Sequence, residues 1–286
     1  MLPNDLRSAL EASLGPLRSI TLVGGGDINA AARIETQDAR YLVKWNSHPR
    51  PRMFEVEARG LSLLATAAAL RIPRVIAVID QPAALVLEWI DVGSNKAAAA
   101  EALGHRLAQQ HRSTAQTYGL DHDNYIGSTP QRNTPARSWI EFYRDQRLGA
   151  QRDLAQRHGH LTPDRARRLD RVMERLDHWI DDDQVVPSLL HGDLWGGNYL
   201  IDTQGNPVLI DPAVYYGDRE AELAFTELFG GFGAQFYTAY DEAWPLDGGY
   251  ADRRDLYNLY HLLNHLKLFG EGYGGSVDTI LRYYAG

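Results

Sequence analysis

The chain has 286 residues, of which 44% are hydrophobic, 23% charged and 10% aromatic. This composition is too apolar for a disordered chain, and the lack of an internal repeat argues against a solenoid. The formal net charge of -8 disfavours a protein that binds nucleic acid through many phosphate contacts. Because the sequence holds no cysteine, disulfides, thiolate metal sites and thiol catalysis are excluded.

The N-terminal segment and the hydropathy pattern give no indication of export or of a membrane. Residues 1–14 alternate charged residues with Leu and Ala at helical spacing, without the basic segment and apolar core of a signal peptide. No window approaches ~18 consecutive apolar residues. We therefore expect a cytoplasmic protein that has neither a membrane nor a nucleic acid as its partner.

The first 90 residues are predicted to form a small, mostly antiparallel sheet. After the N-terminal helix, strand-like runs separated by glycine and polar residues predict five strands. We expect these strands at 18–23, 30–35, 40–45, 74–79 and 85–90. A helix at 53–69 follows the third strand, with Phe54, Ala58 and Leu61 on its apolar face.

The remainder of the chain is predicted to be mostly helical. Residues 91–95 have the composition of a linker, and a β-rich insert at 188–210 interrupts the helices. Helices are expected at 96–117, 138–157 and 163–180, and again from the insert to the C-terminus. The predicted fold is α+β and bilobal, with an N-lobe of residues 1–90, a helical C-lobe of residues 91–286 and a cleft between them.

The β-rich insert carries the strongest chemical signal in the sequence. It contains the segment HGDLWGGN at 191–198, and its second short apolar strand ends at Asp211. Asp193 and Asn198 have the spacing of the protein kinase catalytic loop. Phosphoryl transfer needs a carboxylate that orients the attacking hydroxyl and accepts its proton, and an oxygen-rich pair that holds Mg²⁺. A polar hairpin loop would explain a lone D-x-x-x-x-N, but not its flanking apolar strands and the aspartate at the strand end.

A lysine and a carboxylate in the predicted N-lobe supply further parts of a kinase site. Only three of the 29 basic residues are lysines, and Lys44 lies inside the third predicted strand. It suits the α- and β-phosphates of ATP, whereas the structural alternative is an edge lysine lying on apolar surface. Glu57 falls in the first turns of the next helix, where a kinase keeps the partner of this lysine. Glu55 competes for that role, but Glu57 borders the buried stripe and is preferred.

A glycine-rich turn between the first two strands suits a loop that covers phosphates. Gly24, Gly25 and Gly26 precede Asp27 and Asn29, so backbone N–H groups there could face a phosphate. The third glycine of G-x-G-x-x-G is missing and a strand follows, which disfavours a Rossmann site, and no G-x-x-x-x-G-K is present. Residues 87–90, just before the linker, would offer backbone groups to adenine.

The segment at 191–198 makes the chain resemble the kinase-like phosphotransferases that include aminoglycoside and choline kinases. Within that superfamily the chain looks closer to the fructosamine/ketosamine-3-kinase family, because Trp-Gly-Gly replaces the more general His-Pro-Gly. Matches extend from about Gly24 to Tyr273. Further segments that carry the resemblance are MFEVEA at 53–58, DPAVYYGDRE at 211–220, TELFGGF at 226–232 and LYHLLNH at 259–265.

The resemblance implies a kinase that uses ATP and Mg²⁺ to phosphorylate the C3 hydroxyl of a ketosamine, in a deglycation or repair role. A ketosamine is a sugar adduct on a free amine or on a protein lysine. The resemblance implies Asp193 as the catalytic base and Asn198 with Asp211 as metal ligands. The nucleotide-binding residues that it implies are Gly25, Gly26, Asp27, Asn29, Lys44, Glu57, Glu88 and Ile90.

Aromatic and acidic residues near the two aspartates predict an acceptor site for a cationic sugar adduct. Trp195 and Tyr215 offer an aromatic face to a sugar ring or an ammonium group. The acidic residues that follow Asp211 either line the binding site of the acceptor substrate or pair with Arg219. These acids are Asp218, Glu220 and Glu222, of which the first two enter the predicted acceptor site. The family more often has His at position 218, and its glycine loop often has a cysteine that this chain lacks.

Two other functions compete with a ketosamine kinase. One is a kinase for another small amino alcohol, such as an aminoglycoside or choline. The other is a non-catalytic nucleotide-binding protein, which the presence of the lysine, both aspartates and the asparagine disfavours. The short segment between Asp211 and the next helix leaves little room for an activation loop, which argues against a regulated protein kinase. His261 and His265 lack an H-E-x-x-H motif and are expected to pack, and we expect a monomer or a weak homodimer.

Overall fold

The structure, a computed structural model, describes residues 2–24, 28–93 and 96–286. Its N-terminal part is one five-stranded antiparallel sheet in the order β1-β2-β3-β5-β4. The strands are β1 (Ser19–Val23), β2 (Ala30–Glu35), β3 (Arg40–Trp45), β4 (Val75–Ile79) and β5 (Ala84–Glu88). The five strands predicted from the sequence are confirmed.

Two helices cover the two faces of this sheet. Alternate residues of a strand point to opposite faces, so Val43 and Trp45 of β3 pack with helix α1 (Asn4–Leu14). On the other face, Leu42 lies in the cluster that includes Phe54 and Leu61 of helix α2 (Met53–Thr66). Lys44 follows the parity of Leu42, and its strand is central in the sheet. Its side chain therefore leaves the sheet toward α2, where Glu57 is located.

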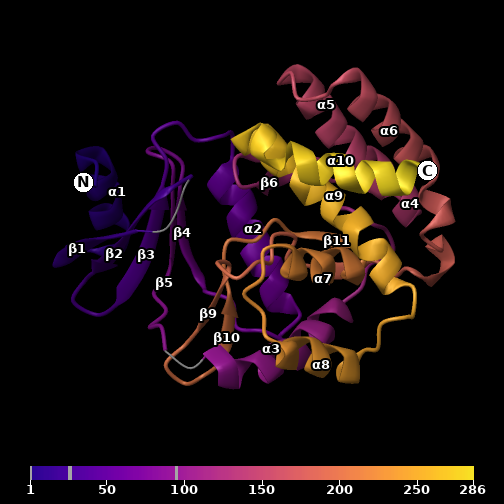
Figure 1. The fold of residues 1–286 in the computed structure, drawn as a ribbon. Coiled ribbons are helices and arrows are strands. Elements are labelled where there is room, and N and C mark those ends of the chain that lie inside the picture. Colours follow the sequence, from indigo (N-terminus) through magenta and orange to yellow (C-terminus); the bar gives the residue numbers. More distant parts are fainter. Residues whose placement is uncertain (1, 25–27, 94–95) are drawn as a thin grey trace.

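The rest of the chain is mostly helical, with three short strand pairs (Figure 1). The pairs are β6 (Asn124–Ile126) with β7 (Thr129–Gln131), β8 (Ser188–Leu190) with β11 (Tyr215–Gly217), and β9 (Tyr199–Ile201) with β10 (Pro207–Leu209). The helices are α3 (Lys96–His111), α4 (Trp139–Phe142), η1 (Tyr143–Gly149), α5 (Ala150–Arg157), α6 (Pro163–Glu174), η2 (Leu176–His178), η3 (Asp182–Gln184), α7 (Arg219–Leu228), α8 (Ala234–Ala243), α9 (Tyr250–Phe269), η4 (Glu271–Tyr273) and α10 (Gly274–Ala285).

Three predicted helices end earlier than expected, and one of them, α2, ends at Thr66 rather than at 69. Helix α3 ends at His111 rather than at 117, because the following segment pairs with the β8 region instead. In that pairing Ser113 accepts a backbone hydrogen bond from Leu189, and Ala115 donates one to Pro187. Helix α6 ends at Glu174 and continues only as the short turn η2.

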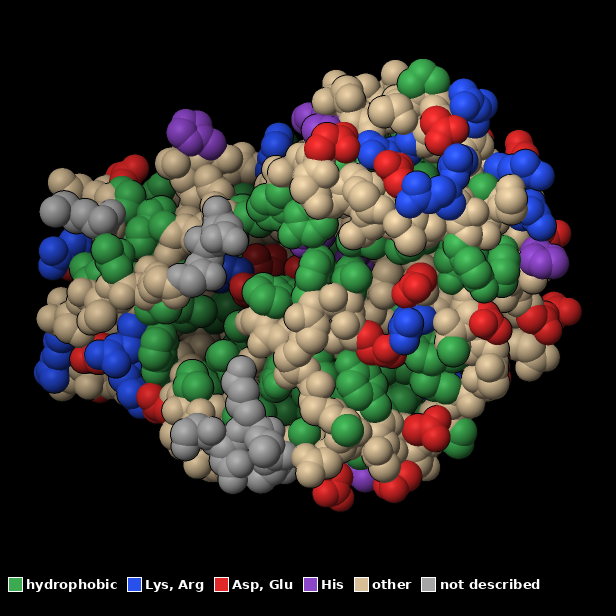
Figure 2. All heavy atoms as spheres, viewed as in Figure 1, with side chains coloured by type: hydrophobic (Ala, Val, Ile, Leu, Met, Phe, Trp, Pro, Cys, Tyr) green, Lys and Arg blue, Asp and Glu red, His purple; other side chains and the backbone are tan. Residues whose placement is uncertain are grey.

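The sheet and the helical part meet around one hydrophobic cluster and leave a hollow beside it. The cluster joins Phe54 and Leu87 of the sheet part with Leu189, Leu209 and Val214 of the helical part. Figure 2 shows the hollow between the two parts, with acidic and basic side chains on its floor. Among the described residues, no helix is long and apolar enough to span a bilayer.

Candidate active site

The loop of residues 191–198 connects β8 to β9 and begins with a close backbone contact. Gly192 has φ +82°, and a Cβ at this position would lie 2.0 Å from the carbonyl oxygen of Ala213. Only glycine avoids both the strained φ and the clash. The loop is therefore seated directly on the segment that follows Asp211.

The buried His191 ring ties this loop to the end of the second aspartate strand. Its Nε2 lies 2.8 Å from the Ile210 carbonyl oxygen, and its Nδ1 lies 3.3 Å from the Asp193 backbone nitrogen. A neutral ring protonated at Nε2 satisfies both contacts, since Nδ1 then accepts. Burial lowers the pKa of His191, which favours this neutral form. One side chain thus sets the positions of both Asp193 and Ile210, which precedes Asp211.

Asp193, Asn198 and Asp211 come together in one cluster. The Asn198 side-chain amide donates to the Asp193 carbonyl oxygen at 2.8 Å and to its carboxylate Oδ2 at 3.1 Å. The backbone carbonyl oxygen of Asn198 accepts a hydrogen bond from the backbone N–H of Ile210 at 3.0 Å. Burial, followed by the charge of Asp211, raises the pKa of Asp193 well above its usual range. A carboxylate in such surroundings is a stronger proton acceptor than an exposed aspartate.

Lys44 reaches this group from the sheet. Its Nζ donates to Glu57 Oε1 at 2.6 Å and to Asp211 Oδ1 at 2.8 Å, and the residue is 7% exposed. Burial alone would lower the pKa of Lys44, but the charges of Glu57 and Asp211 raise it, so the ammonium stays charged. Glu55 instead pairs with Arg52 at the surface. The structure therefore pairs Lys44 with Glu57 rather than with Glu55.

The side-chain oxygen atoms of Asn198 and Asp211 fit a magnesium ion. Asn198 uses its Nδ2 for the contacts to Asp193, which leaves its Oδ1 as a possible ligand, and Asp211 uses only Oδ1 for Lys44. Mg²⁺ is commonly held by one or two protein oxygen ligands together with phosphates and water. Among the described residues no group of three or more His, Cys, Asp and Glu side chains is placed so that it could hold a metal ion by itself. A site completed by nucleotide phosphates matches both observations.

A buried carboxylate on α7 holds the loop from behind. Glu222 Oε1 accepts from the backbone of Gly192 at 2.6 Å, and its Oε2 accepts from the backbone of His191 at 3.1 Å. His111 of α3 lies with Nε2 2.9 Å from Glu222 Oε2 and with Nδ1 2.8 Å from the Tyr240 hydroxyl. Burial opposes the charged form, but the contacts with His111 lower the pKa of Glu222 below its usual value. Helices α3, α7 and α8 are thus connected to the loop of residues 191–198, called the catalytic loop below after its predicted role.

The predicted nucleotide-binding residues lie at the sheet side of the cleft, as far as they are described. Gly25, Gly26 and Asp27 lie outside the described residues, while Asn29 accepts from Asn46 at 3.0 Å. The Glu88 carboxylate pairs with Arg71 at 2.7 Å. In the described part of the chain, neither the N–H nor the C=O of Ile90 has a hydrogen-bond partner. A planar base could therefore bind to the backbone of Ile90, whereas the Glu88 side chain is already engaged.

A family model for fructosamine kinase matches residues 6–285. The chain belongs to the fructosamine kinase family. It is 44% identical over 273 residues to a protein of Lactiplantibacillus plantarum named a probable ketoamine kinase, which covers 95% of this chain and 96% of that protein. It is 39% identical over 279 residues to a protein-ribulosamine 3-kinase, chloroplastic, of Arabidopsis thaliana, with 96% and 85% covered.

Solved structures place this fructosamine kinase family member in the kinase-like fold. A structure from Thermobifida fusca, provisionally named a fructosamine-3-kinase, matches with a TM-score of 0.89 at 33% identity, covering 99% of each chain. An aminoglycoside phosphotransferase matches with a TM-score of 0.67 at 18% identity, covering 98% of each chain. The bilobal, kinase-like α+β fold predicted from the sequence is confirmed.

Of the predicted acceptor residues, only Trp195 has an accessible side chain in this family member. Its indole is 43% exposed and lies over Gly197, where a Cβ would be 2.4 Å from the ring. Tyr215 is 3% exposed, with the Arg147 guanidinium 3.9 Å from its ring centroid. The ring therefore packs in the core behind the catalytic loop and does not offer a face to a substrate.

Asp218 and Glu220 are also buried, each 6% exposed. Asp218 accepts from the backbone of Glu220 at 2.9 Å and from the Tyr257 hydroxyl at 2.5 Å, and Glu220 pairs with Arg253 at 2.7 Å. Arg219 instead donates to the Trp244 carbonyl at 2.8 Å. Neither an acceptor-lining role nor a pairing with Arg219 matches these contacts, because the start of α7 faces inward.

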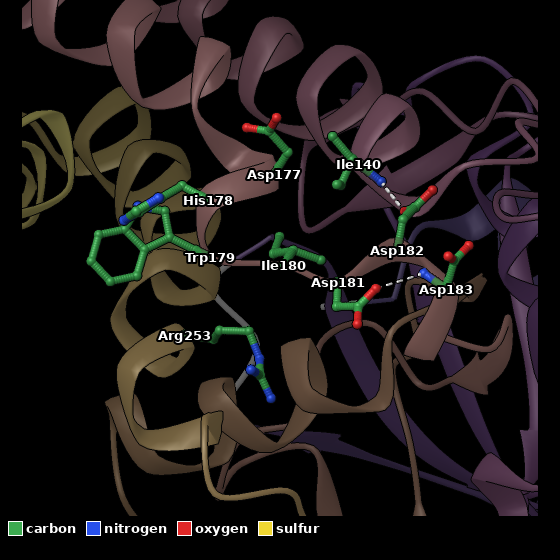
Figure 3. Close-up of a pocket in the computed structure, with 9 residues that line it drawn as sticks. All are labelled: Ile140, Asp177, His178, Trp179, Ile180, Asp181, Asp182, Asp183 and Arg253. Carbon is green, nitrogen blue, oxygen red and sulfur yellow. Dashed lines mark hydrogen bonds between the residues drawn. The ribbon is translucent and has the colours of Figure 1, made fainter.

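A second hollow of about 440 Å³ lies beside these acids (Figure 3). It is lined by the acidic segment 177–183, with Arg253 facing it from α9. Asp182 accepts from the backbone of Ile140 at 2.8 Å, and Asp181 accepts from the backbone of Asp183 at 3.2 Å. These contacts cap short turns, and neither Asp193 nor Asp211 lines the hollow.

Glu222 and His111 support the loop at 191–198, a role that the sequence pattern does not indicate. The pattern places Glu222 on the acceptor side or in a pair with Arg219, and it predicts an ordinary helix residue at His111. An acid between Ala221 and Leu223 on a helix with a buried face indicates a buried carboxylate, which must find partners. The available partners are the first two backbone N–H groups of the catalytic loop.

Proposed function

We propose that the chain is an ATP-dependent kinase that phosphorylates the 3-hydroxyl of ketosamines, in a deglycation or repair role. One observation carries the proposal: Asp193, Asn198, Asp211 and the Lys44–Glu57 pair converge in one cleft of a fructosamine kinase family member. Residues 1–90 and 91–286 would act as the two lobes around that cleft. We further propose a cytoplasmic protein that is a monomer or a weak homodimer.

In the proposed reaction, the sheet side holds the nucleotide. Lys44 contacts the α- and β-phosphates while Glu57 keeps its ammonium in place, and Ile90 together with the backbone at Glu88 binds adenine. The loop with Gly25, Gly26, Asp27 and Asn29 would cover the phosphates. Asn198 and Asp211 would hold Mg²⁺, which would supply positive charge beside the transferred phosphoryl group.

The catalytic loop orients the acceptor. Asp193 accepts a hydrogen bond from the ketosamine hydroxyl and takes its proton as the new O–P bond forms. The bond between the γ-phosphorus of ATP and its bridging oxygen breaks in the same step, and ADP leaves. The amide of Asn198 keeps the carboxylate of Asp193 turned toward the cleft. The resulting alignment of the acceptor hydroxyl with the phosphoryl group contributes much of the rate enhancement. The exposed indole of Trp195 gives the sugar or its ammonium group an aromatic surface. The relatives named ketoamine kinase and protein-ribulosamine 3-kinase support this acceptor class.

The decisive test offers ATP and Mg²⁺ with ribulosamines, erythrulosamines and fructosamines, and locates the phosphate in the product by NMR. We expect phosphorylation at C3 of at least one ketosamine and none of an aminoglycoside or choline. Asp193→Asn should lower kcat by at least ~100-fold while ATP binding persists. Turnover of only the other alcohols would contradict the proposed acceptor, and ATP binding without any turnover would favour a non-catalytic nucleotide-binding protein.

A further inference from the structure

Asp211 has a backbone conformation that its place in the sequence does not favour. Its φ is +55°, in the left-handed region that residues other than glycine rarely adopt. It also precedes Pro212, and a residue before proline is expected to have an extended backbone. Such conformations persist only where the surrounding structure imposes them, and they are concentrated at functional sites. The contacts on both sides of Asp211 therefore determine where its carboxylate points.

The catalytic loop holds the backbone immediately before and after this aspartate. Ile210 donates its backbone N–H to the Asn198 carbonyl at 3.0 Å, and its own carbonyl oxygen lies 2.8 Å from His191 Nε2. On the other side, Ala213 donates its backbone N–H to the His191 carbonyl at 2.9 Å. The next two carbonyl oxygens along the chain, those of Ala213 and Val214, are held by a different part of the molecule.

Two buried amides of the β6–β7 hairpin hold these carbonyl oxygens. Gln131 Nε2 donates to the Ala213 carbonyl at 2.9 Å, and Asn124 Nδ2 donates to the Val214 carbonyl at 2.8 Å. Asn124 and Gln131 lie directly opposite each other in the two strands, so their side chains leave the hairpin on the same face. All four residues are at most 5% exposed. Because the carbonyls are in the interior, a lost donor there is not replaced by water.

Further buried groups fix the orientation of the two amides. Gln131 Nε2 also donates to Asn124 Oδ1 at 2.9 Å, and the Tyr260 hydroxyl donates to Gln131 Oε1 at 2.7 Å. The Asn133 amide donates to Asn124 Oδ1 at 2.9 Å, and its own oxygen accepts from the buried Arg147 guanidinium at 2.9 Å. An amide turned by 180° would place its NH₂ group against these donors and lose the contacts. The NH₂ group of each amide is therefore kept toward the carbonyl oxygen that it holds.

We propose, on the basis of the proposed function, that Gln131 and Asn124 are positioning residues for the metal-binding Asp211. By holding the two carbonyl oxygens that follow, they keep Asp211 in the left-handed conformation in which its Oδ1 reaches Lys44 at 2.8 Å. That arrangement leaves the second carboxylate oxygen for Mg²⁺. Without one of these donors, the segment can relax toward the extended backbone that a residue before proline prefers. The carboxylate of Asp211 then moves away from both the lysine and the metal.

The test measures by calorimetry how much Mg²⁺ tightens the binding of a non-hydrolysable ATP analogue to the full chain. The factor by which Kd falls on adding Mg²⁺ is compared between the wild type and the variants. Gln131→Met keeps the size of the side chain and removes its donor, and it should reduce that factor by about fivefold or more. Asn124→Leu removes the second donor and should act in the same direction. In turnover assays, both variants should need more Mg²⁺ than the wild type for half-maximal rate.

Tyr143→Phe is the matched control for a general loss of stability. The Tyr143 hydroxyl is buried and donates to the Leu256 carbonyl at 2.8 Å, in a contact that does not involve residues 211–214. Its removal should lower the free energy of unfolding, as in the hairpin variants, but should leave the effect of Mg²⁺ on Kd unchanged. If the effect of Mg²⁺ falls in proportion to stability in all the variants, Gln131 contributes only to folding and the proposal is wrong.

Failure of the proposed function is distinguishable from failure of the positioning role. If Mg²⁺ tightens nucleotide binding but no ketosamine is phosphorylated, the proposed acceptor is wrong and the binding test still decides the role of Gln131. If Mg²⁺ has no effect on the wild type, a crystal structure of Gln131→Met decides it instead. A φ of Asp211 outside the left-handed region would support the role, and a φ near +55° with the Ala213 carbonyl in place would overturn it. A wild-type response to Mg²⁺ in both Gln131→Met and Asn124→Leu would also overturn it.

Discussion

The Glu222 carboxylate accepts the backbone N–H of Gly192 at 2.6 Å, so a residue of helix α7 holds the first turn of the catalytic loop. The same carboxylate accepts the backbone N–H of His191 and contacts His111. Hydrogen bonds to an ionised acceptor are stronger than neutral ones. The position of Asp193 therefore depends on a group that does not itself reach the cleft.

Glu222→Gln should lower kcat much more than it changes the KM for ATP. The amide can offer its oxygen to one backbone N–H but must point its NH₂ toward the other, which shifts the loop. We expect kcat to fall by at least ~10-fold. The free energy of unfolding should fall by about 1–3 kcal/mol, since a buried donor loses its acceptor. Steady-state kinetics and urea unfolding measure the two effects.

Glu227→Gln provides the matched control on the same helix. Glu227 contacts Tyr250 and Arg254 and does not touch the catalytic loop. The Glu227→Gln variant should therefore have a kcat within about twofold of the wild-type value, as expected for a substitution away from the loop. If both variants lower kcat in proportion to their loss of stability, Glu222 contributes only to folding.

Glu57→Gln should impair the use of ATP, whereas Glu55→Gln should not. Glu57 holds the buried Lys44 ammonium at 2.6 Å, and removing its charge leaves Asp211 as the remaining described partner of the lysine. Breaking a buried, charged hydrogen bond costs about 2–5 kcal/mol, or a fall in kcat/KM for ATP of ~30-fold or more. Glu55 pairs with Arg52 at the surface, where ion pairs contribute little.

An equal effect of the two glutamate substitutions on kcat/KM for ATP would contradict the assigned pairing. The Lys44→Met variant gives an upper bound for the loss. Its kcat/KM should be no higher than that of Glu57→Gln, because both act through the same ammonium group.

Long, locally encoded features were predictable from the sequence. The five strands of the sheet and the helix with Glu57 follow from residue alternation and turn residues that act over a few positions. The convergence of Asp193, Asn198 and Asp211 was predictable because a short hairpin connects them. The pairing of Lys44 with Asp211 spans 167 positions, and no local pattern in the sequence predicts it.

Features that depend on distant packing were not predictable. The β6–β7 hairpin and β11 have three residues per strand, too few for a period-two pattern to be recognised. Asp218 and Glu220 lie near Asp211 in sequence, but the start of α7 turns them toward Tyr257 and Arg253. Proximity along the chain does not determine which face of a helix points into the core.

Gly192→Ala should abolish folding or activity, while Gly205→Ala should be tolerated. Both glycines have positive φ, +82° and +86°, so both substitutions carry the strain of about 1 kcal/mol for a left-handed residue. Only at Gly192 does the added Cβ meet an atom, the Ala213 carbonyl oxygen at 2.0 Å, whereas nothing lies within 4 Å at Gly205. If the melting temperatures of the two variants fall by the same amount, the loop can move away from Ala213.

Asp218→Asn should remove a pH dependence of stability. Burial, followed by the charge of Glu220, raises the pKa of Asp218 to about 7, against about 3.9 for an unfolded aspartate. Between these values the folded chain keeps a proton that the unfolded chain releases, so the contribution is complete below pH ~4 and is lost as pH rises to ~7. The free energy of unfolding lost over this pH range is at most about 4 kcal/mol.

The asparagine variant keeps the geometry and removes the charge. Its side-chain oxygen can still accept from the backbone of Glu220, and its NH₂ can donate to the Tyr257 hydroxyl. The free energy of unfolding from urea titrations at pH 5 and pH 8 should therefore fall less steeply with pH in the variant than in the wild type. Identical slopes would mean that Asp218 is already ionised at pH 5. Its interaction with Tyr257 would then outweigh both burial and the neighbouring charge of Glu220.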